Sequence, residues 1–282
     1  MSKRVKDRRA PDREATIPDI IAIANQKGGV GKTTTAINLA TSLANHGRRV
    51  LLIDLDPQGN ASTGLGIEYG ARRAGSYALL AEGRPLAELV RDTMVPGLRL
   101  LPADTELAGA EIELVTYDQR EFLLGHALTA IERSDLPYDM VLIDCPPSLG
   151  LLTLNALVAA DSVLVPLQCE FFALEGVSHL VRTIDRVRRS FNPRLQLQGL
   201  VLTMFDKRNN LSELVAEDAR GFFGEQVFET LIPRNIRISE AQSYGKPTLL
   251  YDPRCSGSIA YVKLAEELVD RIERTSSRKA GA

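Results

Sequence analysis

Cysteine is scarce in this sequence, and long apolar runs are absent from it. Its 282 residues include only three cysteines, Cys145, Cys169 and Cys255, which are far apart and form no C-x-x-C pair. This spacing excludes a disulfide framework and a cysteine zinc site, so we expect reduced thiols. No stretch approaches the ~18 consecutive apolar residues of a membrane-spanning helix, and the start lacks the apolar segment of a secretory signal. We therefore expect a cytoplasmic protein that does not enter a membrane.

A large excess of one charge sign is missing as well. Lys and Arg number 34 and Asp and Glu number 36, which gives a formal net charge of −2. This balance argues against a protein that coats nucleic acid through its bulk charge, so any DNA binding must come from a local patch. Apolar residues make up 44% and charged residues 25% of the chain, which is typical of a folded globular protein.

The character of the sequence changes at residue 20. Residues 1–19 are mildly basic and lack apolar periodicity, so we predict a flexible tail there and another at 275–282. Between them, apolar runs alternate with amphipathic stretches without a linker, which predicts one domain at 20–274. Its fold class is α/β: a mostly parallel twisted sheet with helices on both faces. We expect strands at 20–24, 50–54, 98–102, 140–144, 162–166, 197–204 and 227–232, and helices at 32–46, 120–133, 175–191, 211–223 and 258–274.

A glycine-rich loop follows the first expected strand and leads into a helix. It reads NQKGGVGKTT over residues 25–34. Glycines let the backbone curl so that its N–H groups and the helix N-terminus point at an anion, while Lys32 supplies charge and Thr33 a hydroxyl for Mg²⁺. The loop therefore predicts a binding site for ATP with Mg²⁺, formed by Lys27, Gly28, Gly29, Val30, Gly31, Lys32, Thr33 and Thr34.

Two further expected strands end in carboxylates. The second ends in Asp54 and continues to Asp56, and alternation along a strand places both on one face. The fourth closes its apolar run with Asp144, the Walker B pattern that holds Mg²⁺, usually through water. Because the carboxyl ends of parallel strands form the ligand-binding edge of such sheets, we expect these carboxylates beside the glycine-rich loop.

The string KGGVGKTT at 27–34 resembles the deviant Walker A motif of the ParA/MinD group of P-loop ATPases, and the chain is most similar to the ParA/Soj partitioning branch over roughly 20–274. The resemblance implies a weak ATPase whose homodimer encloses two ATP molecules. It assigns Lys27 to the partner's nucleotide, Lys32 to phosphate binding and Asp56 to the attacking water. Thr33, Asp56 and Asp144 would surround the metal.

The resemblance also concerns later blocks of the sequence. Residues 201–208 and 232–241 match partitioning blocks that surround the adenine, which implies base contacts by Met204, Pro233 and Asn235. An asparagine amide can both donate to and accept from a purine edge. Related proteins bind DNA through basic residues in such places, which here are Arg208, Arg234, Arg237 and Arg254. If the turn is helical, Arg234 and Arg237 share a face.

These features predict an ATP-dependent DNA-partitioning ATPase associated with the nucleoid. With about three phosphate contacts per protomer, a monomer binds weakly, whereas an ATP-bound dimer with about six binds duplex DNA without sequence preference. A ParB-like centromere-binding partner would stimulate hydrolysis and release the protein. Alternatives are a MinD-like division-site ATPase, although the tail at 272–282 offers little to bury in lipid, and a nucleotide-gated scaffold or filament.

Overall fold

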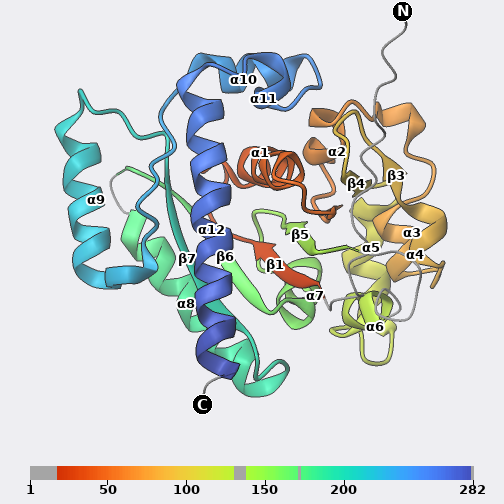
Figure 1. Cartoon of the computed structure of the whole chain (residues 1–282). Coiled ribbons are helices and arrows are strands. Elements are labelled where there is room, and N and C mark those ends of the chain that lie inside the picture. Colours follow the sequence, from red (N-terminus) through yellow and green to blue (C-terminus); the bar gives the residue numbers. More distant parts are fainter. Residues whose placement is uncertain (1–17, 130–137, 171–172, 281–282) are drawn as a thin grey trace, which may run out of the picture.

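The computed structural model describes residues 18–129, 138–170 and 173–280. Its centre is a seven-stranded sheet in the order β3-β4-β2-β5-β1-β6-β7, parallel except where β3 pairs with β4 (Figure 1). The strands are β1 Asp19–Ile23, β2 Val50–Asp54, β3 Arg91–Asp92, β4 Leu98–Leu101, β5 Met140–Asp144, β6 Ser162–Gln168 and β7 Gln196–Thr203. This confirms the predicted α/β fold with its mostly parallel sheet.

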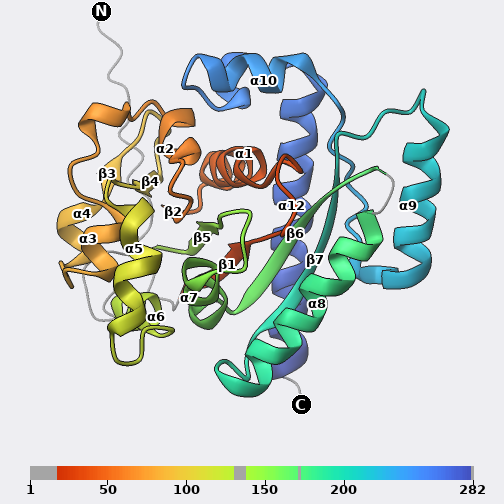
Figure 2. The same ribbon diagram turned by 180° about the vertical axis from the view of Figure 1, so that it is seen from behind.

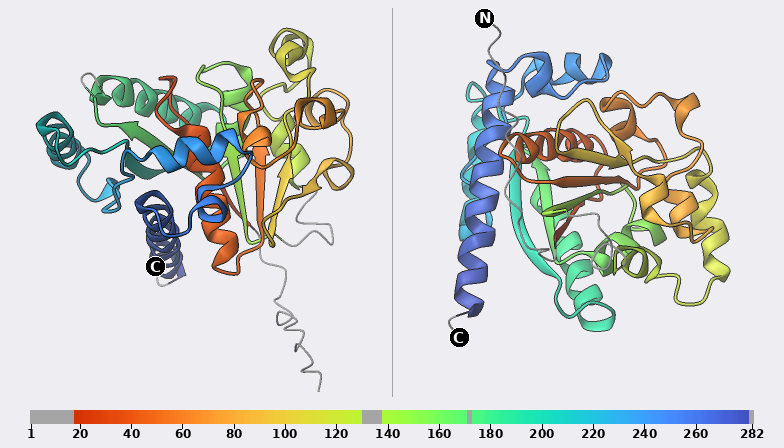
Figure 3. Two further views of the ribbon diagram at one scale, coloured as in Figure 1. Left: turned by 90° about the horizontal axis from the view of Figure 1, so that it is seen from above. Right: turned by 45° about the vertical axis from the view of Figure 1, so that its right-hand side comes forward.

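Helices cover both faces of the sheet because the strands carry apolar side chains on both. In β1, Ile21 and Ile23 join one core with α1 and α12, while Ala22 joins a second core with the helices of the opposite face. Figure 2 shows α7 and α8 on that opposite face, and Figure 3 shows the sheet between the two helical layers. All five residues of β2 and of β5 are buried, as expected for central parallel strands.

The longer helices are α1 Lys32–Asn45, α7 Leu151–Ala159, α8 Ala173–Ser190, α9 Asn210–Phe223, α10 Ile236–Ser243 and α12 Ser256–Ala280. Shorter ones are α2 Asn60–Gly64, α3 Ser76–Leu80, α4 Leu86–Leu89, α5 Leu107–Glu113, α6 Leu123–Thr129 and α11 Thr248–Tyr251. Of the helix expected at 120–133, residues 123–129 form α6, and its end lies outside the described residues. α12 continues past the expected end at 274, into the segment predicted as a tail.

The strand predicted at 227–232 is wrong. This segment runs beside β7 but makes only isolated bridges, from Val227 to Leu200 and from Pro233 to Phe205. The backbone N–H groups of Glu229 and Thr230 both donate to the carboxylate of Glu267 on α12, at 2.8 and 2.9 Å. In a β-strand, consecutive backbone N–H groups point to opposite sides. Two consecutive N–H groups that donate to the same carboxylate therefore interrupt the hydrogen-bond ladder of a strand.

Candidate nucleotide site

The glycine-rich loop lies between the end of β1 and the start of α1. Gly29 has φ +75° and Gly31 φ +88°, a left-handed conformation that glycine adopts without steric cost. A Cβ atom at Gly28 or Gly29 would meet nothing within 4 Å, and both residues line the cavity described below. The loop thus turns its backbone around a free space in front of the N-terminus of α1, which favours an anion there.

Lys32, the first residue of α1, brings a cation to this space. It is 6% exposed, and its Nζ donates to the backbone oxygen of Lys27 at 3.0 Å. Burial lowers the pKa of Lys32, while the nearby carboxylates of Asp144 and Asp56 act in the opposite direction. Any further negative charge that enters the loop would therefore stabilise the charged form of Lys32.

Asp144 ends β5 directly beside Asp54 at the end of β2, since these two residues are register partners. It is fully buried, and within the described part of the chain neither carboxylate oxygen accepts a well-formed hydrogen bond. Burial holds the pKa of Asp144 well above its usual range, with the charge of Asp54 adding to the effect, although the nearby Thr33 hydroxyl lowers it. A buried oxygen pair without partners, next to a threonine hydroxyl, has the donor chemistry that Mg²⁺ prefers.

Asp54 and Asp56 have different surroundings. Asp54 is fully buried and accepts from Ser62 N–H and Oγ–H, at 2.8 and 2.7 Å, and from Asp56 N–H at 3.2 Å. Burial raises the pKa of Asp54 to about 6. Asp56 lines the cavity described below, and its Oδ1 accepts from Gln58 N–H at 3.0 Å. Asp54 thus anchors the turn that presents Asp56, a role that the two-residue spacing alone does not reveal.

The sequence analysis also missed Arg72, which supports the same turn. Its side chain is almost fully buried and donates to the backbone oxygen of Ile67 and to the hydroxyl of Thr63. A Cβ at Gly59, which precedes α2, would collide with the guanidinium of Arg72. Gly59 is therefore required for this packing. Arg72 lies in no motif, so local sequence offers no signal for it.

One cavity of about 700 Å³ joins the glycine-rich loop to the residues predicted at the adenine. We call it the nucleotide cavity. Its lining includes most of the predicted site: Gly28, Gly29, Gly31, Lys32, Thr33, Thr34, Asp56, Met204, Pro233 and Asn235. Val30 is buried beneath it, and its backbone oxygen accepts from Thr203 Oγ–H at 2.8 Å. The structure therefore brings together blocks far apart in the sequence, while the contacts assigned to each residue stay predictions.

Asn235 serves the local fold as well. Its Oδ1 accepts from Arg237 N–H at 2.8 Å and caps α10, and its Nδ2 donates to Ser256 Oγ at 2.8 Å. An amide has a second N–H and a further lone pair, so these bonds leave one of each for a base. The neighbouring Met204 has φ +51°, unusual for a residue with a side chain.

Lys27 has a carboxylate partner just after the end of β6. Its Nζ forms an ion pair with Glu170 Oε2 at 2.9 Å, and both side chains are about half exposed, at 49% and 47%. An exposed pair of this kind contributes about 0 to 1 kcal/mol, so Lys27 can exchange Glu170 for another anion at little cost.

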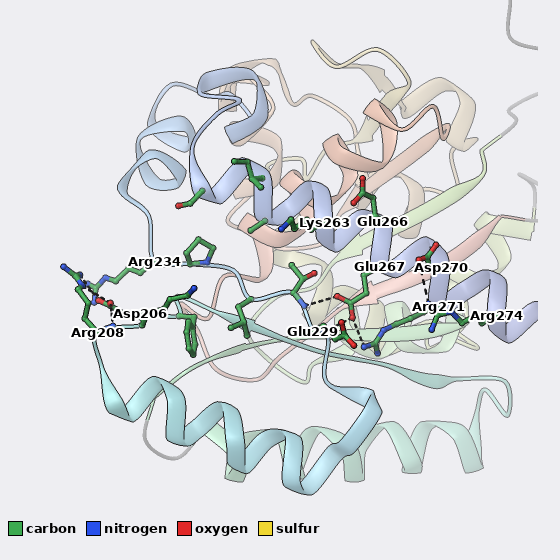
Figure 4. Close-up of a pocket in the computed structure, with 18 residues that line it drawn as sticks. Asp206, Arg208, Glu229, Arg234, Lys263, Glu266, Glu267, Asp270, Arg271 and Arg274 are labelled. Carbon is green, nitrogen blue, oxygen red and sulfur yellow. Dashed lines mark hydrogen bonds and ion pairs between the residues drawn. The ribbon is translucent and has the colours of Figure 1, made fainter.

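The four predicted DNA-binding residues, Arg208, Arg234, Arg237 and Arg254, are exposed, and we call them the arginine surface. Arg208 donates to both oxygens of Asp206, at 3.0 and 2.8 Å, and Figure 4 shows this pair beside Arg234 at one end of a groove along α12. Arg237 pairs with Glu240 at 2.8 Å and lies 3.7 Å from Asp252. Among the described residues, Arg234 and Arg254 form no ion pair.

Arg234 and Arg237 were expected to share a face only if their turn is helical, and this condition is not met. Helix α10 begins at Ile236, with Asn235 as its extended N-cap, so Arg234 precedes the helix. Its N–H instead donates to the backbone oxygen of Phe205 at 3.0 Å, which ties it to the segment after β7.

Searches of the described residues for two other kinds of feature found none. No group of three or more His, Cys, Asp or Glu side chains is arranged to hold a metal ion. No helix there has the length and apolar character needed to cross a membrane.

Comparisons with known proteins place these features in context. A family model described as an AAA domain matches residues 18–197. The chain is 60% identical over 261 residues to the chromosome partitioning protein ParA of Caulobacter vibrioides strain NA1000 / CB15N, covering 93% of this chain and 97% of that protein. It is 51% identical over 249 residues to the sporulation initiation inhibitor protein Soj of Bacillus subtilis strain 168, covering 88% and 97%.

Among solved structures, the fold matches a protein from Mycobacterium smegmatis named cobyrinic acid a,c-diamide synthase, crystallised with bound ADP and magnesium. The TM-score is 0.79 at 38% identity, and the match covers 91% of this chain and 96% of that one. The sequence matches to partitioning proteins are much closer, at 51% and 60% identity, so they define the family.

Proposed function

Since the chain belongs to the ParA/Soj family of chromosome-partitioning ATPases, we propose that it partitions DNA by an ATP-driven cycle. In this cycle the protein dimerises with ATP, binds duplex DNA without sequence preference in the cytoplasm, and leaves it after hydrolysis. A ParB-like centromere-binding partner stimulates that hydrolysis. The single observation that carries the proposal is the buried Lys32 that lines the nucleotide cavity, close enough to the buried carboxylate of Asp144 for the two charges to interact.

Each charged group of the cavity has a part in ATP hydrolysis. Lys32 and the loop N–H groups bind the phosphates, and Thr33 and Asp144 hold Mg²⁺, directly or through water. A Mg²⁺ ion held there would neutralise charge that develops on the transferred phosphoryl group. Asp56, oriented by the turn that Asp54 anchors, accepts a hydrogen bond from the attacking water. Met204, Pro233 and Asn235 at the other end of the cavity contact the adenine.

The position of Lys27 supports the proposed dimerisation. Among the described residues its half-exposed ammonium pairs with the half-exposed carboxylate of Glu170, and a partner's nucleotide phosphates offer a stronger anion. Two protomers that exchange Lys27 in this way enclose two ATP molecules. ATP then controls DNA binding, because one protomer contributes about three phosphate contacts and a dimer about six.

A division-site ATPase that docks on membrane is the nearest alternative. Such docking needs an amphipathic helix with a free apolar face. In α12, Tyr261, Leu264 and Leu268 are buried in the core with α1, and Ile259 is the large apolar side chain that stays exposed among the described residues of this helix. This observation favours the DNA-partitioning function.

The test measures DNA binding against nucleotide state. Fluorescent duplexes of unrelated sequence are titrated with the protein in Mg²⁺ and ADP, or Mg²⁺ and a non-hydrolysable ATP analogue, while light scattering reports the molar mass. We expect dimers and tight binding only with the analogue, equal on all sequences. ATP turnover is then measured with DNA and a ParB-like partner, which should raise it. Equal DNA affinity with ADP and with the ATP analogue would contradict the proposed cycle.

A further inference from the structure

Gln242 on α10 reaches from the C-terminal part of that helix to the phosphate-binding loop. Its Nε2 donates to Thr34 Oγ1 at 2.7 Å, although the two residues are 208 positions apart in the sequence. Both side chains line the nucleotide cavity. Neither the glycine-rich motif nor the blocks assigned to the adenine and DNA identify Gln242, which was not among the predicted site residues.

The chemistry of the Thr34 hydroxyl makes this contact sensitive to a nucleotide. A hydroxyl has one donor and two acceptor positions, and Gln242 uses an acceptor position. The Thr34 proton therefore remains available to a phosphate oxygen in the cavity. Hydrogen bonds in such a chain polarise one another, so donation from Thr34 to an anion strengthens its acceptance from Gln242.

A second contact connects the same region to the helix after α10. The Oδ1 of Asn38 accepts from Thr248 N–H at 2.8 Å, at the start of α11. The Nδ2 of Asn38 donates to the backbone oxygen of Thr34, also at 2.8 Å. The first turns of α1 thus contact α10 through Thr34 and α11 through Asn38, and Asn38 is itself bonded to Thr34. Figures 1 and 2 show α10 lying over α1 on this side of the sheet.

A third contact links the α10–α11 turn to the helix that follows Asp56. A Cβ at Gly245 would lie 3.1 Å from the backbone oxygen of Thr63 and 3.4 Å from the Cα of Gly66. Gly245 has φ +61°, so glycine is needed for its conformation and for this close approach. Thr63 itself lines the nucleotide cavity. The segment 236–251 therefore contacts two elements that border the nucleotide cavity, α1 through Thr34 and Asn38 and α2 through Thr63.

The other end of α10 carries part of the arginine surface. Arg237 lies in its first turn and Gln242 in its second half, within a helix of eight residues. Such a short helix moves as a unit, so a restraint on Gln242 also restrains Arg237.

We propose that Gln242 is a positioning residue that couples the nucleotide cavity to the segment 236–251. Nucleotide phosphates that engage the Thr34 hydroxyl tighten its bond to Gln242 and reduce opening of α10 and α11. Only the last step, presentation of Arg237 to DNA, rests on the proposed function.

Hydrogen–deuterium exchange tests the coupling without DNA. The wild-type chain, Gln242→Leu and Gln242→Asn are compared with and without Mg²⁺ and a non-hydrolysable ATP analogue. We expect the analogue to slow exchange at least about fivefold in wild-type peptides from 236–251, the lower end of typical couplings between sites. Both variants should lose this slowing at 236–251, because Leu removes the N–H donor and Asn is too short to reach Thr34. Both should keep the slowing of exchange at 28–45, where the nucleotide itself binds. Gln196→Leu, a change on β7 away from the cavity, is the matched control.

Three results would overturn the inference: no nucleotide-dependent slowing at 236–251 in the wild type, the same slowing in both variants, or its loss in Gln196→Leu. Gln242→Asn keeps a polar amide, so it remains informative if Gln242→Leu does not fold. A parallel DNA titration separates the two proposals. A wild type that shows protected 236–251 but no ATP-dependent DNA binding contradicts the proposed function and leaves the coupling intact.

Discussion

Two charged groups beside the phosphate-binding loop are buried and incompletely compensated, whereas all four of the arginine surface are exposed and two of these are paired with carboxylates. Lys32 and Asp144 belong to the first kind. Arg208 with Asp206 and Arg237 with Glu240 belong to the second. Buried charges without compensation are costly unless a ligand completes them, and exposed pairs exchange partners at little cost. A bound ligand should therefore stabilise the phosphate-binding loop, whereas the arginine surface can bind and release anions reversibly.

The largest effect is expected when a buried charge is removed. Lys32→Ala deletes the cation that lies near Asp144 and Asp56, and with it the charge-assisted contacts to the phosphates. We expect ATP affinity to fall by about 10³-fold, equivalent to about 4 kcal/mol, measured by titration calorimetry with Mg²⁺. Lys27→Ala is the control: it should bind ATP almost as the wild type but remain monomeric by light scattering. Equal loss of ATP affinity in both variants would contradict the assignment of Lys27 to a partner.

Charge reversal on the surface comes next. Arg234→Glu with Arg237→Glu removes up to four phosphate contacts per dimer, which should lower DNA affinity by about 10²- to 10³-fold at 0.1 M salt and flatten its salt dependence. ATP-dependent dimerisation should persist. Because Arg237 is already paired, Arg234→Glu alone should cost more than Arg237→Glu alone. DNA titrations at several salt concentrations measure both effects.

The control for this experiment makes the same change on the opposite face of the sheet. Arg188→Glu with Arg189→Glu lies in the last turn of α8, and it should leave DNA affinity within about threefold, since distant exposed charges are largely screened. An unchanged salt slope in the Arg234 and Arg237 variant would place the patch elsewhere, at Arg208, Arg254 or the basic N-terminal residues.

A smaller change is expected for the group that faces the attacking water. Asp56→Ala should slow ATP hydrolysis by about 10²-fold, the usual contribution of a positioned acid–base group, while ATP binding persists. The variant should accumulate as a DNA-bound dimer. Steady-state phosphate release measures the rate, and Asp92→Ala, an exposed carboxylate paired with Arg99, is the control. Unchanged turnover would mean that another group orients the water.

The smallest effect is expected when a paired arginine of the arginine surface loses its carboxylate partner. Asp206 neutralises Arg208, and this ion pair lowers the pKa of Asp206 to about 2, so mild acidification leaves the carboxylate charged. Asp206→Asn should release Arg208 and raise the DNA affinity of the ATP-bound dimer by several-fold, with a steeper salt slope. Asp185→Asn, which frees Arg188 on α8 in the same way, should not. Weaker DNA binding in Asp206→Asn would show that the carboxylate supports the surface.

The sequence predicted the loop side of the site better than the surface. The glycine-rich loop and the strands ending in Asp54 and Asp144 depend on short-range patterns, and the structure has them where expected. The segment 227–232 does not form the predicted strand, because two of its backbone N–H groups donate to the carboxylate of Glu267, which lies far along the chain. The two-residue strand β3 was too short to give a pattern. The pairing of Arg237 with Asp252 depends on tertiary folding.

The unpartnered carboxylate of Asp144 has a consequence for how this protein can evolve. A buried acid that accepts no well-formed hydrogen bond is unfavourable for folding, and replacement by a neutral side chain of similar size removes that cost. Selection for folding alone would thus remove Asp144. Its presence means that the fold accepts a less robust resting state in return for a ligand-dependent one. The free energy of unfolding of such a protein is highest when nucleotide is bound. Cellular nucleotide levels therefore also affect how much of it escapes degradation.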